Sequence, residues 1–202
     1  GREDFCRRND LDPSRPIVSF LPGSRIKELQ RILPPMIDAI EQLRTVRPEV
    51  QSIVVVAPSR TVEEVREITS GDINLIEQQT REALAASDAA VIASGTATLE
   101  AALLETPMIV VYKESPINWH TLGRLITVPH YGLVNLVAGR EIATELMQDD
   151  LTGDNVLKEL MKLLEPEMNR KMREQLREVS MKLGAPGASK RAAAVIVSFL
   201  QD

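Results

Sequence analysis

The chain has 202 residues and a formal net charge of −5, with 44% hydrophobic and only 3% aromatic residues. This length suits one domain or slightly more at roughly 150 residues per domain, and the core must be aliphatic. The negative charge argues against a general nucleic-acid-binding protein. The single cysteine, Cys6, excludes an intrachain disulfide, and Cys and His are too few for a structural zinc site. No stretch approaches the ~20 apolar residues that span a bilayer.

Apolar runs alternate with amphipathic stretches over residues 1–144. The continuously apolar runs at 52–57 and 108–112 indicate strands that are buried on both faces. The pattern therefore predicts an α/β fold with a Rossmann-like, doubly wound parallel sheet. We expect strands at 16–21, 52–57, 73–76, 89–93 and 108–112, with a weaker one near 131–134. We expect helices at 28–47, 61–69, 80–86, 97–104 and 116–126, with Thr61 and Thr80 as N-caps.

From residue 145 onward the pattern predicts helices only, at 155–164, 167–183 and 189–200. We therefore divide the chain into a Rossmann-like domain over residues 1–144 and C-terminal helices over 145–202. The last helix is nearly all apolar on one side. It would pack on a neighbouring domain or subunit, or alternatively against the sheet of this same domain.

The first glycine-containing turn is Leu-Pro-Gly-Ser-Arg (residues 21–25), which joins a buried strand to a helix. Arg25 suits a diphosphate because its planar guanidinium can bridge two oxygens. The alternative is a surface arginine in an ordinary strand-to-helix loop. Neither a GxGxxG fingerprint nor a Walker loop occurs in the chain.

A second such turn is Ser-Gly-Thr-Ala-Thr-Leu-Glu (residues 94–100), which again leads from an apolar strand into a helix. Free N–H groups and the positive end of a helix dipole meet at such a turn and favour an anion. Gly95 allows close approach of a phosphate, and the hydroxyls of Ser94 and Thr96 add donors. Glu100, one turn into the helix, is a good acceptor for sugar hydroxyls. The alternative is an ordinary helix capped by Thr96.

A third polar segment, at residues 133–141, holds Asn135, Gly139, Arg140 and Glu141. We expect it to form a strand-to-helix loop after the weak strand near 131–134. Because the carboxyl ends of parallel strands share one edge, the three segments would face one crevice. Loop solvation and local capping are the alternative for each residue.

The stretch 115–126 contains the only tryptophan, Trp119, and His120. An apolar and basic helix near a crevice suits a lipid surface, whereas a packed tryptophan is the alternative. No Ser-His-Asp, Cys-His or paired-carboxylate arrangement is indicated.

Together these segments resemble the lipid-A-disaccharide synthase family. The resemblance rests on Leu-Pro-Gly-Ser-Arg (21–25), Ala-Ser-Gly-Thr-Ala-Thr-Leu-Glu (93–100), Thr-Pro-Met-Ile-Val-Val-Tyr-Lys (106–113) and Val-Asn-Leu-Val-Ala-Gly-Arg-Glu (134–141). The order and spacing match across nearly the whole chain. The family comprises inverting GT-B glycosyltransferases, which join UDP-2,3-diacylglucosamine to 2,3-diacylglucosamine 1-phosphate and release UDP. They act at the inner face of the cytoplasmic membrane of Gram-negative bacteria.

The resemblance implies that this chain is the C-terminal, donor-binding half of a GT-B fold. The chain begins Gly-Arg-Glu-Asp without an initiator Met, so we expect an excised segment whose N-terminal half, with the general base, lies elsewhere. No metal or cofactor is implied. The last helix would cross onto the missing half or a partner subunit, such as a second copy in a homodimer, and 115–126 would meet the inner membrane surface.

The resemblance also implies roles for individual residues. Gly23, Ser24 and Arg25 would contact the diphosphate, and Ser94, Gly95 and Thr96 would donate N–H and hydroxyl groups. Glu100 would accept from the ribose hydroxyls. The pyrophosphate or donor sugar would be held by Asn135, Arg140 and Glu141.

Alternative functions would use the same nucleotide site for a different reaction or for none. A UDP-N-acetylglucosamine 2-epimerase or the peptidoglycan glycosyltransferase of similar architecture would also bind UDP, but neither should prefer an acylated donor. A nucleotide-binding or scaffold module without catalysis is the third alternative.

Overall fold

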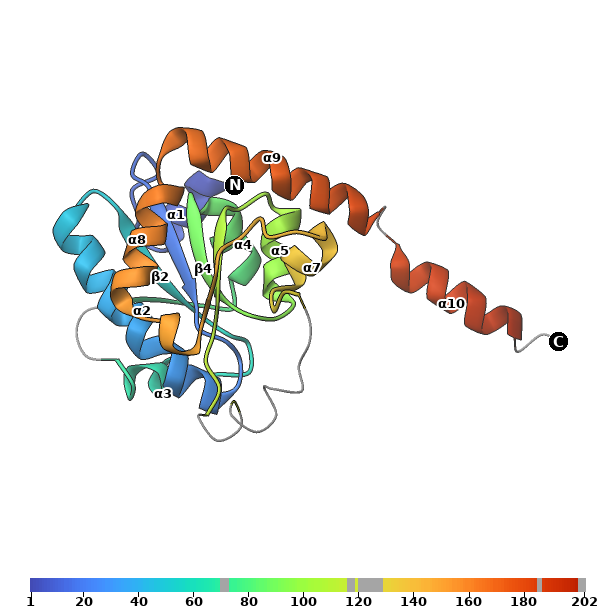
Figure 1. Cartoon of the computed structure of the whole chain (residues 1–202), viewed down its shortest axis with the longest axis horizontal. Coiled ribbons are helices and arrows are strands. Elements are labelled where there is room, and N and C mark those ends of the chain that lie inside the picture. Colours follow the sequence, from blue (N-terminus) through green and yellow to red (C-terminus); the bar gives the residue numbers. More distant parts are fainter. Residues whose placement is uncertain (70–72, 116–118, 120–128, 185–186, 200–202) are drawn as a thin grey trace.

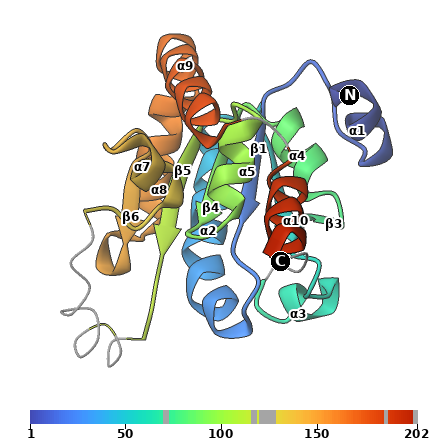
Figure 2. The same cartoon turned by 90° about the vertical axis from the view of Figure 1, so that its right-hand side faces the viewer.

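The computed structural model describes residues 1–69, 73–115, 119, 129–184 and 187–199. One six-stranded sheet lies at its centre, and helices cover both faces (Figures 1 and 2). All strand pairs are parallel, which confirms the predicted α/β, Rossmann-like architecture. The strand order is β3-β2-β1-β4-β5-β6, so the winding direction reverses between β1 and β4.

The five strands predicted with the clearest pattern are confirmed. In β1 and β4 every residue is buried, as expected for strands covered on both faces. The pairing of Leu21 with Ile92 brings the carboxyl ends of these two strands level. The strand bounds are β1 (Ile17–Leu21), β2 (Gln51–Val56), β3 (Asn74–Glu77), β4 (Ala89–Ala93), β5 (Met108–Tyr112) and β6 (Glu145–Met147).

The weak strand expected near 131–134 is wrong. Residues Leu133–Ala138 form the helix α7, which ends at Gly139 in the left-handed conformation with φ of 75°. The sixth strand is instead β6, just beyond residue 144, where we expected helices only. A short apolar run such as Leu-Val-Asn-Leu-Val fits a strand or a buried helix equally well, and only its packing decides between them.

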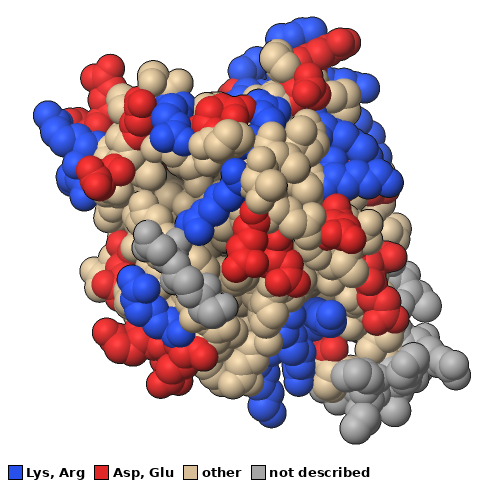
Figure 3. Space-filling model, turned by 90° about the vertical axis from the view of Figure 1, so that its left-hand side faces the viewer, with Lys and Arg blue, Asp and Glu red and all other residues tan. Residues whose placement is uncertain are grey.

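Two pairs of helices sandwich the sheet. On one face α2 (Ile26–Val46) crosses α8 (Gly153–Leu163), and on the other α4 (Thr80–Ala86) lies beside α5 (Ala97–Leu103). A Cβ atom on Gly153 would lie only 2.7 Å from the Cβ of Asp38, so glycine permits the close crossing of α2 and α8. Positive and negative side chains are intermixed over the α2 side of the molecule (Figure 3).

One of the two N-cap predictions is confirmed and the other is wrong. Thr61 caps α3 (Val62–Arg66) in a capping box with Glu64 and is confirmed. Thr80 is wrong, because the N-cap of α4 is Gln79 and Thr80 is already helical. The sequence pattern did not predict α1 (Arg2–Arg8), which packs on α4. The expected helix at 116–126 lies outside the described residues except for Trp119.

The two last helices behave differently. Helix α9 (Pro166–Leu183) packs on α5, α7 and α8 across the amino-terminal edge of the sheet. Helix α10 (Ala188–Phe199) projects away from this body (Figure 1), and Ile196 and Phe199 are 61% and 77% exposed. The alternative that this helix docks on its own sheet is therefore not the observed arrangement. Among the described residues, no helix is long and apolar enough to cross a membrane.

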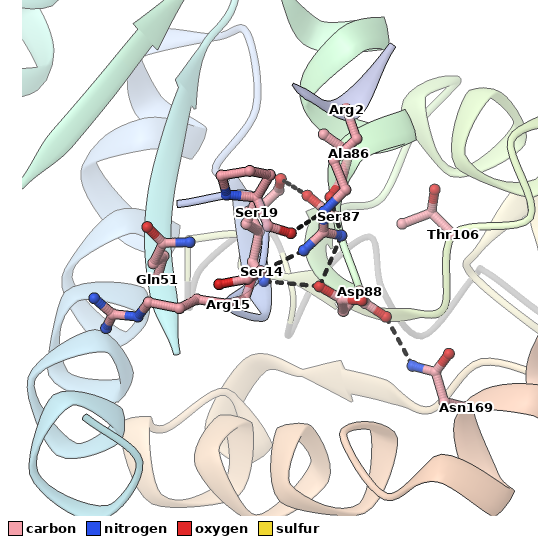
Figure 4. Close-up of polar contacts among 12 residues, drawn as sticks. Arg2, Ser14, Arg15, Ser19, Gln51, Ala86, Ser87, Asp88, Thr106 and Asn169 are labelled. Atoms are coloured by element: carbon pink, nitrogen blue, oxygen red, sulfur yellow. Dashed lines mark hydrogen bonds and ion pairs between the residues drawn. The ribbon is translucent and has the colours of Figure 1, made fainter. Parts of the chain in front are cut away.

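One aspartate joins three elements at the amino-terminal edge of the sheet (Figure 4). The Asp88 carboxylate accepts hydrogen bonds from Ile17 N at 2.8 Å and from Arg2 Nη1 at 3.0 Å. The Asp88 carbonyl oxygen accepts from Asn169 Nδ2 at 2.8 Å. Asp88 thus ties α1 and α9 to the start of β1, on the edge opposite the loops that were predicted to bind a ligand.

We predict that Asp88→Ala lowers the free energy of unfolding by about 2–3 kcal/mol, because the Ile17 N–H loses its acceptor and Arg2 loses its ion pair. Urea denaturation followed by circular dichroism measures this change. Glu3→Ala removes an exposed acidic side chain from α1 and should shift stability by less than about 0.5 kcal/mol. Equal effects of the two substitutions would contradict the role of Asp88.

Candidate functional site

A cavity of about 490 Å³ opens at the carboxyl ends of β1 and β4, where the winding of the sheet reverses. In open α/β sheets this is the place where ligands bind. The two glycine-containing turns, more than sixty residues apart in sequence, meet there because β1 and β4 are neighbours. The predicted residues that line the cavity are Gly23, Ser24, Arg25, Ser94, Gly95, Thr96 and Glu100.

The first turn presents a cation to the cavity. Arg25 is the N-cap residue of α2, and its side chain is 80% exposed. Its Nη1 donates to Glu28 Oε1 at 2.7 Å, and this bond raises the pKa of Arg25 above the ordinary arginine value. Gly23 has φ of 107°, and a Cβ there would lie 3.2 Å from Glu28 Oε2. Glycine therefore gives the turn both its left-handed conformation and the room for Glu28.

The second turn presents open backbone donors. Within the described chain, the N–H groups of Gly95, Thr96 and Ala97 donate no hydrogen bond. Thr96 occupies the N-cap position of α5, but its side chain makes no capping bond. The capping alternative from the sequence is thus not what this turn does. Three unoccupied donors at a helix start provide a polar, electropositive surface.

The two hydroxyl groups of this turn differ in their use. Ser94 Oγ donates to the backbone carbonyl of Tyr131 at 2.8 Å, so its proton is already engaged by the protein. Thr96 is exposed at the cavity, and no described group bonds to its hydroxyl. Glu100, also exposed, lies at the cavity one turn further along α5.

Sequence reasoning missed several lining residues. Glu28 is the most important, because its 17% exposed carboxylate holds Arg25. The signal was its position three residues after Arg25, at the spacing of helical neighbours. The remaining missed residues give the cavity an apolar wall and a hydroxyl: Leu21, Val55, Ala57, Pro58, Thr80, Ala93 and Ala97. Leu21, Ala93 and Ala97 adjoin the polar residues of the two turns, whereas Val55, Ala57 and Pro58 belong to no motif.

The third polar segment does not line this cavity. Asn135 is fully buried. Its Nδ2 donates to the Ala143 carbonyl and to Glu145 Oε1, and its Oδ1 accepts from the N–H groups of Ile142 and Ala143. The expectation of a shared strand-end crevice fails here because the segment starts a helix rather than following a strand.

The other two residues of this segment lie at the surface. Arg140 pairs with Glu178 of α9 at 3.1 Å, and Glu141 is exposed in the loop that follows α7. Neither Arg140 nor Glu141 is among the residues that line the cavity.

The fold and this edge define the class of protein. The chain superposes on the calicheamicin glycosyltransferase CalG4 with a TM-score of 0.62 at 15% identity, covering 94% of this chain and 43% of that one. For the glycosyltransferase VinC in complex with dTDP the TM-score is 0.58 at 17% identity, covering 96% and 44%. At these identities the likeness shows the fold alone, which is one Rossmann-like half of the GT-B type.

The chain belongs to the lipid-A-disaccharide synthetase family, whose model matches residues 2–198. It is 40% identical to the lipid-A-disaccharide synthase of Solibacter usitatus over 205 aligned positions, covering all of this chain and 53% of that protein. It is 34% identical to the corresponding synthase of Geobacter sulfurreducens, covering 99% and 53%. The chain thus spans about half the length of these relatives.

We predict that Asn135→Ala lowers the free energy of unfolding by about 3 kcal/mol or more, because it leaves buried donors and acceptors unpaired. Thermal and urea denaturation measure the loss. Glu178→Ala breaks only the exposed pair with Arg140 and should cost less than about 1 kcal/mol. An Asn135→Ala variant as stable as the wild type would contradict this structural role of Asn135.

Proposed function

We propose that this chain is the donor-binding half of an inverting glycosyltransferase. The reaction joins UDP-2,3-diacylglucosamine to 2,3-diacylglucosamine 1-phosphate and gives lipid A disaccharide 1-phosphate and UDP. The observation that carries the proposal is the meeting of Arg25, three open N–H groups and Glu100 at one cavity of about 490 Å³. Membership of the family selects this donor over that of a 2-epimerase or a peptidoglycan enzyme.

The diphosphate would lie between the two glycine turns. Arg25 supplies a cation that can bridge oxygens of both phosphates, and the amides of Gly95, Thr96 and Ala97 supply N–H donors. Gly23 and Ser24 form the rim beside Arg25. As the glycosidic bond to the donor breaks, negative charge grows on UDP, and these groups stabilise it.

Glu100 would orient the nucleoside. A carboxylate repels phosphate but accepts hydrogen bonds from vicinal hydroxyls, so it suits the ribose. The distance along α5 from Thr96 to Glu100 is one helical turn, which separates the phosphate donors from the sugar acceptor. The apolar side chains of Val55 and Pro58 would face the less polar parts of the ligand.

The general base and the acceptor site would belong to the N-terminal half of the whole protein. We place the enzyme at the inner face of the cytoplasmic membrane, since both substrates carry acyl chains. The exposed apolar side of α10 would cover either that half or a second copy of the chain. Asn135, Arg140 and Glu141 remain proposed contacts of the donor sugar only if α7 and its following loop move on binding.

We expect calorimetric titration to show UDP binding by the protein, with no added metal and with ADP binding at least about tenfold more weakly. Glu100→Ala should weaken UDP binding by about tenfold, the loss of one or two hydrogen bonds to hydroxyls. No UDP binding by the folded protein, or equal affinity for ADP, would contradict the proposal.

Arg25→Ala should weaken UDP binding by about 1.5–3 kcal/mol, as expected for a charged contact to the diphosphate. The same titration with uridine provides the control, because uridine lacks the phosphates and should bind both proteins alike. Arg66→Ala, on α3 and outside the cavity, should leave the UDP affinity unchanged. An unchanged affinity in Arg25→Ala would remove this residue from the site.

A further inference from the structure

We propose that Ser94 and Glu145 together hold the backbone of Tyr131–Gly132, an arrangement called the latch below, and thereby fix the turn that begins α5 at the nucleotide cavity. The inference deepens, and rests on, the proposed function. Glu145 lies on β6, two strands from β4, and does not line the cavity. Ser94 lines the cavity, yet its hydroxyl proton is directed at the protein backbone rather than into the open space.

The two side chains of the latch form hydrogen bonds to one short backbone stretch, Tyr131–Gly132, from two sides. Ser94 Oγ donates to the Tyr131 carbonyl at 2.8 Å. On the other side, Glu145 Oε2 accepts from Tyr131 N at 2.8 Å, and Glu145 Oε1 accepts from Gly132 N at 2.9 Å. One side chain therefore fixes the carbonyl of this stretch and another fixes both of its N–H groups.

The space around Gly132 is too narrow for a side chain. A Cβ atom on Gly132 would lie 3.1 Å from Val110 Cγ2 and 3.2 Å from Glu145 Oε1. The backbone is thus enclosed between β5 and the Glu145 carboxylate. Asn135 Nδ2 donates to the same Oε1 at 2.8 Å, which ties the beginning of α7 into the latch.

The latch is connected to the cavity through α7 and through Ser94. Helix α7 packs against α5, which bears the open N–H groups and Glu100. A Ser94 residue held by Tyr131 also holds the turn that starts α5. We infer that Ser94 is a positioning residue and not a phosphate ligand, and that Glu145 acts on nucleotide affinity through it.

A glutamine cannot replace Glu145. The carboxylate accepts three N–H groups with two oxygens. Glutamine has one oxygen and an NH₂ group, which would face another donor. Aspartate keeps both oxygens on a shorter side chain and should restore part of the function.

The test is a double-mutant cycle on UDP affinity, using Ser94→Ala, Glu145→Gln and the double variant. Each single variant should weaken UDP binding by about tenfold. The double variant should bind UDP no more weakly than the weaker-binding single variant does, because both substitutions break the same latch. Glu145→Asp should recover part of the loss. Asp149→Asn, an exposed acidic residue four positions after Glu145, should bind like the wild type.

Additive losses would overturn the latch, because they would mean that Ser94 contacts the nucleotide independently of Glu145. Wild-type affinity in a folded Glu145→Gln variant would overturn it as well. No UDP binding by the wild-type protein would instead reject the proposed function, and this inference with it.

Trp119 gives a second readout that needs no ligand. It is the only tryptophan, and its ring centroid lies 5.8 Å from that of Tyr131. Release of Tyr131 in Ser94→Ala should shift the Trp119 emission before any nucleotide is added, whereas loss of a phosphate contact should not. If Glu145→Gln does not fold, an unchanged emission in Ser94→Ala rejects the latch.

Discussion

The pairing of β1 with β4 is the constraint on which the proposed site depends. These strands are neighbours although residues 22–88 separate them, and their register sets Leu21 beside Ile92. Neither glycine turn alone offers more than a helix start. Placed level on adjacent strands, one supplies the guanidinium of Arg25 and the other supplies open N–H groups. Their ladder pairs Val18 with Ala89 and continues in register to Leu21 and Ile92, so the two strand ends stay level.

The two edges of the sheet differ in how their polar groups are paired. At the amino-terminal edge, Asp88 and the arginines around it satisfy backbone groups. Arg2 Nη1 donates to the Ala86 carbonyl as well as to Asp88, and Arg173 Nη1 donates to the carbonyl of Glu105. Burial lowers the pKa of Arg173, because the low-dielectric surroundings disfavour its charged form. At the carboxyl edge, by contrast, the N–H groups of Gly95, Thr96 and Ala97 have no partner among the described residues.

The sequence was informative where one signal was enough. Continuous apolar runs identified five strands, and glycine between a strand and a helix identified both turns that meet at the cavity. It failed where the outcome depended on distant partners. The run Leu133–Ala138 is helical because α5 and α9 pack on it, and no local pattern records those neighbours. Asn135 is polar and close to a glycine in the sequence, as a ligand-binding residue would be. Its side-chain amide, however, forms its hydrogen bonds to other groups of the chain. Glu145 gave no signal, since two of its partners are backbone N–H groups and the third, Asn135, lies ten residues away.

The position of Glu145 at the first residue of β6 has a consequence for how the length of this chain can vary. Side chains alternate between the two faces along a strand, so a shift of β6 by one residue relative to β5 would turn the residue at this position to the opposite face. The connection from Gly139 to Thr144 therefore has a fixed length, since adding or removing one residue there would move the carboxylate away from Gly132. Insertions and deletions among related chains should avoid this connection.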